Sequence, residues 1–424
     1  MHRRGLWHNR AFLSLWAGET VSMIGSAVTE LALPLTAILL LHATPWQLGV
    51  LLALETVATA GLSLFVGAWS DRVRRRPLMI AADIGRALLV ASVPVALVLG
   101  WLRIEWLYAV AVLIGALDAL FSSAYQGFFP NIVPEEDLVG ANGRLEGSRN
   151  FAQIIGPGLA GALIQAFQAP FALFIDAASF LASAFSVAMI RGAEVNRPAR
   201  GKRGNLWREI GQGLSMTFGQ PLLRTMLIVV VIFNFFAPML NAQLALFAVR
   251  VLGLTPLLLG LQIVAVGMCG VLAAFITGAV TKRLGMGPTM VLATLLISSG
   301  WLSVATLQRS WPATLLLMIL GASVGTTGDV LININAATLR QLLTPDHLRG
   351  RVGATMRLFI LGAQPLGALI GGVVGATFGV RAAIFCAGGG FFLGFLAAFF
   401  SPLRALSQAP ASVQTPAATP LVAE

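Results

Sequence analysis

The chain has 424 residues, of which 57% are hydrophobic and only 11% are charged, and its mean hydropathy is +0.84. Soluble domains carry about 25% charged residues, so this composition excludes a soluble globular protein and indicates a chain that lies largely in lipid. The net charge of +11 does not indicate a nucleic-acid-binding protein, because the basic residues occupy short segments between apolar runs.

Twelve apolar segments are long enough to cross a membrane, which takes about 20 residues per helix. The first six are Leu13–Leu41, Trp46–Trp69, Leu78–Leu99, Trp106–Gln126, Phe151–Phe167 and Phe171–Ile190. The other six are Leu222–Val249, Pro256–Val280, Pro288–Leu307, Trp311–Ala337, Val352–Phe378 and Arg381–Phe400. We therefore predict an all-α polytopic membrane protein built from two six-helix bundles, residues 1–190 and 222–401.

Two segments lie outside the predicted bundles. A central loop at 191–221 contains GNLWREIGQGLSMTFG, which predicts a short amphipathic helix on the membrane surface. The tail at 402–424 is rich in Ala, Pro, Ser and Thr and is predicted to be disordered.

The distribution of Lys and Arg predicts the orientation. An even number of spans places both termini on one side, together with the predicted loop Pro130–Arg149 and the basic residues within Arg340–Arg357. That side carries 23 of the 28 basic residues, the other side carries four, and Arg86 lies within a span. Short cytoplasmic loops are rich in Lys and Arg, so we predict that both termini are cytoplasmic.

A duplication relates the two halves. The segment Gly67–Pro77, GAWSDRVRRRP, recurs 211 residues later as GAVTKRLGMGP at Gly278–Pro288. At the same shift, Gly49 matches Gly260. Each half has an even number of predicted spans, so the copies should be related by an axis along the membrane normal.

Acidic residues within the spans indicate a polar interior. Seven of the chain's 17 acids lie there: Glu19, Glu30, Glu55, Asp83, Asp118, Asp176 and Asp329. A charge at the bilayer centre costs at least about 2.5 kcal/mol, so these side chains should face water or the protein interior.

Polar residues recur at helical spacing on the first, fourth, seventh and tenth spans. They are Glu19, Ser22, Ser26 and Glu30; Asp118, Ser122 and Tyr125; Asn234 and Asn241; and Thr326, Asp329 and Asn333. The pattern predicts a polar cavity between the halves. Hydrogen bonding between helices is an equally good explanation for the Ser and Asn members, whereas the carboxylates favour the cavity.

The remaining acids have more local explanations. Asp83 and Arg86 are three residues apart, which predicts an ion pair within one helix. Asp176 is expected to accept hydrogen bonds from the backbone or from Ser179. Two explanations stay open for Glu55: it faces the cavity, or it pairs with a residue on the eleventh span.

Proline and glycine interrupt the fifth and eleventh spans. Gly156, Pro157 and Gly161 lie in the fifth, and Pro365 lies near the corresponding place in the eleventh. Proline removes a backbone hydrogen bond, and glycine lets a neighbouring helix approach closely. These residues predict paired bends of the kind that transporters use for gating, although a simple kink explains them too.

Other function classes receive little support. The four histidines lie in different loops, which gives no pattern typical of a metal site. The chain contains no G-x-x-x-x-G-K phosphate-binding motif. We therefore expect no metal, no cofactor and no enzymatic or ATP-driven activity.

The motif at Gly67–Pro77 resembles the signature of the major facilitator superfamily between its second and third spans. Arg74 departs from that signature, and the residues that match it are Gly67, Asp71, Arg72, Arg75 and Arg76. The stretches LWAGETVSMIG, AADIGRALLV and FFPNIVPEEDLVGANGRLEG narrow the resemblance to the branch of siderophore exporters and macrolide-efflux permeases.

This resemblance implies a monomeric, proton-driven exporter in a bacterial inner membrane that opens alternately to each side. Its partners would be lipid, protons and a small amphipathic compound, such as a drug, a macrolide or a siderophore-like molecule. The arginine usual on the fourth span of such exporters is missing, and Asp118 lies in that neighbourhood. Glu30 and Asp118 are our first candidates for proton coupling, followed by Glu19 and Asp329.

Other transport activities stay open at this point. An importer or facilitator and a lipid flippase would have the same fold, and a membrane-embedded enzyme is a weaker alternative. A net negative cavity would favour cationic or amine-bearing substrates.

The lone acid of the motif predicts a conformational latch. Asp71 in the first copy is replaced by Lys282 in the second, so Asp71 is expected to pair with arginines or a helix N-terminus only when the cytoplasmic side is closed. Asp71→Asn should lower transport without changing membrane insertion, as measured by transport in vesicles and by topology reporters. Transport at the normal rate would reduce the loop to an orientation signal.

Overall fold

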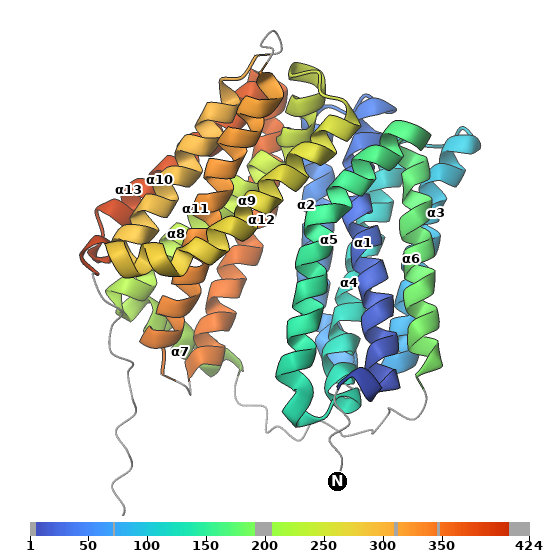
Figure 1. Cartoon of the computed structure of the whole chain (residues 1–424), viewed down its shortest axis with the longest axis horizontal. Helices are drawn as coiled ribbons and strands as arrows, with labels where there is room; N and C mark the ends of the chain where they lie inside the picture. Colours follow the sequence, from blue (N-terminus) through green and yellow to red (C-terminus); the bar gives the residue numbers. More distant parts are fainter. Residues whose placement is uncertain (1–5, 71–72, 191–205, 309–312, 346–347, 407–424) are drawn as a thin grey trace, which may run out of the picture.

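The computed structural model describes residues 6–70, 73–190, 206–308, 313–345 and 348–406, and every regular element in these ranges is helical. The first group of helices comprises α1 (Arg10–Leu39), α2 (Pro45–Ser70), α3 (Arg75–Val98), α4 (Ile104–Ile132), α5 (Leu138–Phe167) and α6 (Ala169–Met189). After α7 (Leu206–Gly219), the second group comprises α8 (Pro221–Leu246), α9 (Pro256–Leu284), α10 (Met286–Ala305), α11 (Thr314–Leu343), α12 (Arg349–Phe378) and α13 (Val380–Phe399). Figure 1 shows α1 to α6 on one side of the molecule and α8 to α13 on the other.

Hydropathy located the helices well. Within the described ranges, ten helices are long and apolar enough to cross a membrane by length and composition. Most predicted spans begin and end within a few residues of an observed helix. The eighth span, for example, starts at Pro256 in both the prediction and the structure.

The predicted loop Pro130–Arg149 was wrong for most of its length, and the predicted spans on either side of residues 338–351 were too short. Helix α4 continues to Ile132 and α5 already begins at Leu138, while α11 continues to Leu343 and α12 begins at Arg349. Only the apolar part of a helix gives a hydropathy signal, because the polar turns at its ends can be solvated by water. The connections between these helices are therefore short.

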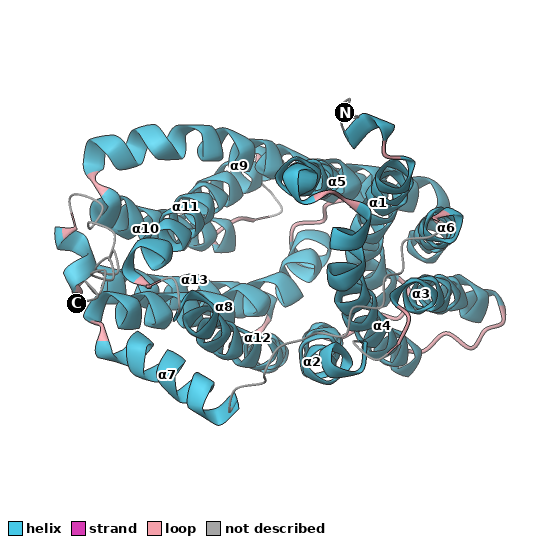
Figure 2. Cartoon of the chain, turned by 90° about the horizontal axis from the view of Figure 1, so that it is seen from below, coloured by secondary structure: helices cyan, strands magenta, loops and turns pink. Residues whose placement is uncertain are grey.

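The amphipathic segment in the central loop does form a helix, α7, but this helix also packs against protein. A Cβ atom placed on Gly213 would lie 2.6 Å from the carbonyl oxygen of Arg351 in α12. Gln212 accepts a hydrogen bond from the same arginine. Figure 2 shows α7 along the outer side of the second group of helices.

The chain after α13 is ordered for longer than expected. A short 3₁₀ helix covers Pro402–Ala405, and Leu403 is only 1% exposed. The backbone N–H of Gly287 in α10 donates a hydrogen bond to the carbonyl of Leu406 at 2.9 Å. The prediction of disorder from residue 402 was therefore wrong up to residue 406, and residues 407–424 lie outside the described ranges.

Two matching helix pairs join the two groups. Gly49 of α2 meets Gly372 of α12, and Gly260 of α9 meets Gly161 of α5. A Cβ atom placed on Gly49 would lie 2.8 Å from the Cα of Gly372, and one placed on Gly260 would lie 3.1 Å from the Cα of Gly161. Both partners obey the 211-residue shift, since 49 corresponds to 260 and 161 to 372. The duplication read from the sequence is thus confirmed at the level of backbone contact.

Hydrogen bonds strengthen the same end of the molecule, which lies opposite the N-terminus (Figure 1). Gln243 in α8 donates to the carbonyl of Pro45 at 3.0 Å. A single π-helical turn, Phe247–Val251, follows α8 and carries Arg250, whose guanidinium donates to the carbonyl of Ile38 at 3.2 Å. The two groups of helices are therefore closed against each other at this end.

The glycine contacts make a steric prediction. Gly260→Leu should push α9 away from α5 and lower the melting temperature of the purified protein, because overpacking a tight contact costs about 1–3 kcal/mol. Gly278→Leu makes the same change on the same helix where no atom lies within 4 Å, and it should melt like the wild type. Equal melting temperatures for the two variants would contradict the contact.

Candidate functional site

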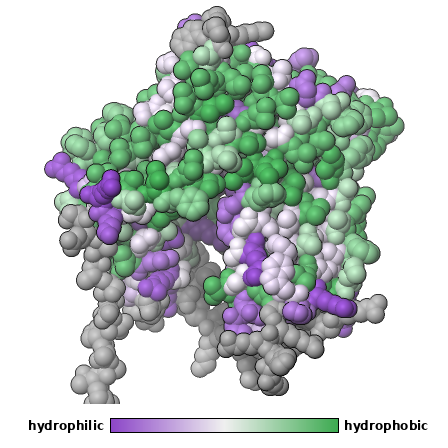
Figure 3. Space-filling model, viewed as in Figure 1, coloured by the Kyte–Doolittle hydropathy of each residue, from purple (hydrophilic) through white to green (hydrophobic). Residues whose placement is uncertain are grey.

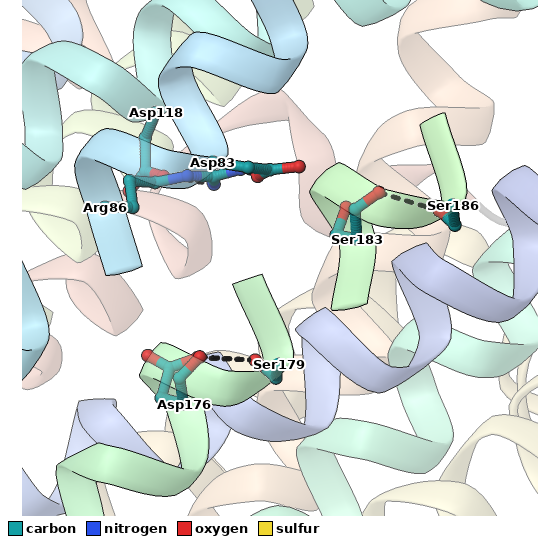
Figure 4. A network of polar contacts seen from close by, with 7 residues as sticks. All are labelled: Asp83, Arg86, Asp118, Asp176, Ser179, Ser183 and Ser186. Carbon is teal, nitrogen blue, oxygen red and sulfur yellow. Dashed lines mark hydrogen bonds and ion pairs between the residues drawn. The ribbon is translucent and has the colours of Figure 1, made fainter. Parts of the chain in front are cut away.

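A buried ion network occupies the interior of the first group of helices (Figure 4). Arg86 of α3 is 7% exposed. One of its terminal nitrogens, Nη1, lies 2.6 Å from Asp118 Oδ1 in α4, and the other, Nη2, donates to Asp83 one turn earlier on α3. The predicted ion pair between Asp83 and Arg86 is confirmed, and Asp118 extends it to a second helix.

Two aromatic rings enclose this guanidinium. The Cζ atom of Arg86 lies 4.4 Å from the ring centroid of Phe121 in α4 and 4.4 Å from that of Phe180 in α6. A cation over an aromatic face is attracted by the ring quadrupole, most strongly away from water. Arg86 thereby joins α3, α4 and α6 through both its charge and its flat faces.

Asp176 forms a second buried site, between α6 and α1. Ser179 Oγ donates to one of its carboxylate oxygens at 2.9 Å, as predicted, and Thr29 Oγ1 of α1 donates to the other. The two helices approach closely here, because a Cβ atom on Gly25 would lie 2.1 Å from Ser179 Oγ. Both oxygens of this buried acid are therefore satisfied by neighbouring hydroxyl groups.

Glu19 of α1 is buried without such partners. Its side chain is 8% exposed, and its Oε1 atom finds no hydrogen-bond partner among the described residues. It is close enough to Arg86 and Asp83 for their charges to act on it. Burying an unpaired carboxylate costs so much free energy that such a group is normally neutral.

Two further acids, Glu30 of α1 and Glu55 of α2, lie within the range of the charge of Asp118 on α4. The carboxylates of Glu30 and Glu55 are near enough to Asp118 for their charges to repel, and Glu55 also repels Glu30. Glu30 is exposed, and the Asp118 side chain is 36% exposed. The structure thus brings Glu30 and Asp118 into one electrostatic neighbourhood and adds Glu55, which the sequence left undecided.

The second group of helices contains a different set of polar residues. Asp329 and Asn333 of α11 form a hydrogen bond at 3.0 Å, and both are exposed. Asn234 of α8 accepts a hydrogen bond from Gln364 of α12 at 3.1 Å. Asn241 is exposed on α8.

The surface is hollowed between the two groups at the end that carries the N-terminus, and hydrophilic residues border this opening (Figure 3). Ser26 of α1 is half-buried, and Ser122 of α4 is exposed. The opposite end is closed by the glycine contacts described above. An opening at one end, acids inside and a duplicated helical scaffold are the features of a transport path.

Comparison with known proteins decides the family. The sequence profile of the Major Facilitator Superfamily matches residues 15–368 of this chain. The chain belongs to the Major Facilitator Superfamily. It is therefore a multi-pass membrane transporter of small molecules and not an enzyme.

Similar proteins within the Major Facilitator Superfamily include drug exporters. The chain is 27% identical to the multidrug efflux pump Tap of Mycolicibacterium fortuitum over 80% of this chain and 86% of that protein. It is 22% identical to macrolide efflux protein A of Streptococcus pyogenes over 87% of this chain and 90% of that protein.

Solved structures of transporters share the fold. The nucleoside transporter NupG has a TM-score of 0.72 at 11% identity, covering 92% of this chain and 99% of its own. A bacterial homologue of the iron transporter ferroportin in its inward-facing state has a TM-score of 0.73 at 15% identity, covering 92% and 98%.

Part of the superfamily signature lies outside the described ranges, namely Asp71 and Arg72, while Gly67 belongs to α2. The other two arginines that match the signature, Arg75 and Arg76, bind backbone carbonyl groups. Arg75 Nη1 donates to Gly127 in α4 at 2.6 Å, and Arg76 Nε donates to Val187 in the last turn of α6 at 3.1 Å. A cation at the carboxyl end of a helix is also favoured by the helix dipole.

The residues predicted to bend helices make contacts between helices. Gly156 of α5 lies against Ala27 of α1, and the carbonyl of Pro157 lies against Gly260 in α9. Pro365 is buried in α12. Helices α5 and α12 each continue as one element through their proline.

Sequence reasoning missed the contact between Arg86 and Asp118. The three-residue spacing of Asp83 and Arg86 already explained the arginine, so a partner on another helix was not sought. A usable signal was present, because Asp118 stood without a cation on the helix that follows directly in the chain. Gln364, Gln243 and Arg250 were also missed, since their partners lie more than 120 residues away in sequence.

Proposed function

We propose that this transporter is a secondary active exporter that couples the efflux of a small amphipathic compound to proton entry by alternating access. The names of the two efflux relatives support export. The charges of Glu30 and Glu55 act on Asp118, which binds the buried guanidinium of Arg86, and this arrangement supports proton coupling. Neighbouring carboxylates repel one another, so each favours a proton on the next, and such a cluster is suited to binding and releasing protons.

The proposal includes a topology of twelve spans. Helices α1 to α6 (residues 1–190) and α8 to α13 (residues 222–401) would form two six-helix bundles, with α2 and α5 among the spans. The central loop 191–221 and both termini would be cytoplasmic, in a bacterial inner membrane, and the protein would act as a monomer. The excess of basic residues on one side supports this orientation.

In this orientation the described conformation would open toward the cytoplasm. The outer end would be closed by the two glycine contacts and by the hydrogen bonds of Gln243 and Arg250. The proposed latch at Asp71 would form after the opposite, cytoplasmic end closes. The exposed Asn241, Asp329 and Asn333 would contribute to the wall of the substrate path, together with Ser26, Ser122 and Asn234.

Neutralising the carboxylate cluster should abolish coupling. The variant Glu30→Gln/Asp118→Asn should lose proton-driven accumulation of ethidium, erythromycin and tetracycline inside everted vesicles, where the cytoplasmic face points outward, because the cluster can no longer bind and release a proton. Cells that express it should be as susceptible to these compounds as cells that lack the transporter. Glu105→Gln, on the exposed first turn of α4, is the control and should behave like the wild type.

The direction of movement separates the alternatives. Accumulation of the compounds inside cells that express the wild-type protein would indicate an importer or facilitator. Movement of a fluorescent phospholipid without movement of the three compounds would indicate a lipid flippase. Unchanged dependence on the proton gradient in the double variant would contradict proton coupling.

Removal of the Arg250 contact should favour the outward-open state. Arg250→Gln takes away a bond between the two groups of helices, so a cysteine placed at Ala368, which is buried in α12 beside Gly49, should react faster with an impermeant maleimide. Arg381→Gln is the matched control, because Arg381 also binds backbone carbonyls, those of Ala305 and Leu307, but within one group. Equal reaction rates for both variants would show that Arg250 does not hold the outer end closed.

A further inference from the structure

The short helix that precedes α1 has a counterpart before α8. Helix α1 begins at Arg10 and α8 begins at Pro221, so the 211-residue shift of the duplication matches the two helix starts residue for residue. The same shift places the 3₁₀ helix Leu6–His8 on residues 217–219, the last residues of α7. Each group of helices therefore begins with a short helical segment at the end of the molecule that carries the N-terminus (Figure 1).

The two segments have the same pattern of burial. Leu6 is 6% exposed, and the corresponding Thr217 is 0% exposed. The next residue in each segment is an exposed aromatic one, since Trp7 is 59% exposed and the corresponding Phe218 is 44% exposed. In both segments one residue is thus docked on the protein while its aromatic neighbour leaves much of its ring uncovered.

Both segments pack against the first turns of an equivalent helix. A Cβ atom placed on Gly140 of α5 would lie 3.3 Å from Cδ1 of Leu6. The position of Gly140 corresponds to Arg351 of α12, and the carbonyl of Arg351 lies against Gly213 of α7. Because α5 and α12 are related by the duplication, the two contacts are copies of one contact.

Neighbouring side chains hold each exposed ring in place. The Cζ atom of Arg144 lies 5.0 Å from the ring centroid of Trp7, and the ring of Trp16 meets that of Trp7 edge-on at 5.9 Å. Phe218 meets Phe359 of α12 edge-on, with 6.1 Å between the ring centroids. Such contacts favour a fixed orientation of the rings, so the uncovered parts of Trp7 and Phe218 form defined surfaces.

The place of these rings in the chain puts them near a bilayer surface. Helices α1 and α8 belong to segments that are long and apolar enough to cross a membrane. Each ring lies three residues before the first residue of its helix. Figure 2 shows the first described residues beside α5 at one outer edge of the molecule and α7 at another. Aromatic side chains concentrate at the boundary between hydrocarbon and water.

We propose that Leu6–His8 and the last residues of α7 are two equivalent membrane anchors, in which Trp7 and Phe218 lie among the glycerol and ester groups of phospholipids. Exposed arginines beside the anchors support this partner. Arg10 and Arg224 lie in the first turns of α1 and α8. The helix dipole disfavours a cation there, and a lipid phosphate would favour it.

The anchors give α5 and α12 the same mechanical position in the two groups. Each of these helices packs against an anchored segment near its first residues and reaches the other group of helices at the closed end, through Gly161 in α5 and Gly372 in α12. One end of each helix is thereby referred to the bilayer surface, and the other end belongs to the contact between the groups. Movement of either group is then guided by the same lipid surface.

The test places a fluorescent probe at each ring. Trp7→Cys and Phe218→Cys are made separately in a Cys269→Ser/Cys386→Ser background, labelled with bimane, purified and reconstituted in phosphatidylcholine liposomes. A nitroxide near the carboxyl end of the lipid acyl chain should quench both probes several-fold more than one near the methyl end, and iodide in the water should quench them little. Because both side chains are exposed, the variants should melt like the wild type.

Two further positions calibrate the probe. Ser215 is an exposed polar residue on α7, and Leu181 is an exposed apolar residue in the middle of α6. Bimane on Ser215→Cys should be quenched mainly by iodide, because this position faces water. Bimane on Leu181→Cys should be quenched mainly by the nitroxide near the methyl end, because this position faces the hydrocarbon.

Three results would overturn the anchors. Iodide quenching at Trp7→Cys or Phe218→Cys as strong as at Ser215→Cys would place the ring in water. Shielding from iodide without quenching by either lipid would mean that protein covers the ring. Lipid quenching at only one of the two positions would overturn their equivalence. The measurement contains no transport step, so its result is independent of the proposed export and proton coupling.

Discussion

The structure depends on one constraint, which is that a guanidinium buried among apolar helices must never be without a counter-ion. Removing charges from water costs several kcal/mol per ion, and the mutual attraction offsets this only when geometry and hydrogen bonds are good. Arg86 meets the constraint with carboxylates from α3 and α4 and with aromatic rings from α4 and α6. Helices α3, α4 and α6 are thereby held together around a single cation.

The duplication allows the two groups of helices to be compared. The second group has the same scaffold, but other residues stand at the positions of the Arg86 network. The 211-residue shift places Ile297 opposite Arg86 and Thr294 opposite Asp83. Asp329, the counterpart of Asp118, forms its hydrogen bond with Asn333, and the position of Asn333 corresponds to Ser122. The two halves therefore share their glycine contacts and differ in their charges.

The sequence predicted those features that each helix displays by itself. Apolar length located the helices, and the three-residue spacing of Asp83 and Arg86 located an ion pair. Helix ends were less predictable, since polar turns beyond the bilayer carry no hydropathy signal. Contacts such as Asn234 with Gln364 were not predictable at all, because they depend on which helices become neighbours and on how each is rotated. The contact between Gly161 and Gly260 was partly predictable. The repeat showed that Gly260 corresponds to Gly49, but it did not show which glycine each of them contacts.

Contacts that hold the two groups together differ in kind from those inside the first group. At the closed end, the hydrogen bonds of Arg250 and Gln243 end on the backbone carbonyls of Ile38 and Pro45, and glycine backbones pack against each other beside them. Such contacts can separate in water at little cost, because both the donor and the carbonyl are hydrated once they part. The ion network around Arg86 cannot open in this way, since its members would stay in a nonpolar interior without partners. The molecule thus places its reversible contacts between the two groups and keeps its ion network inside the first group.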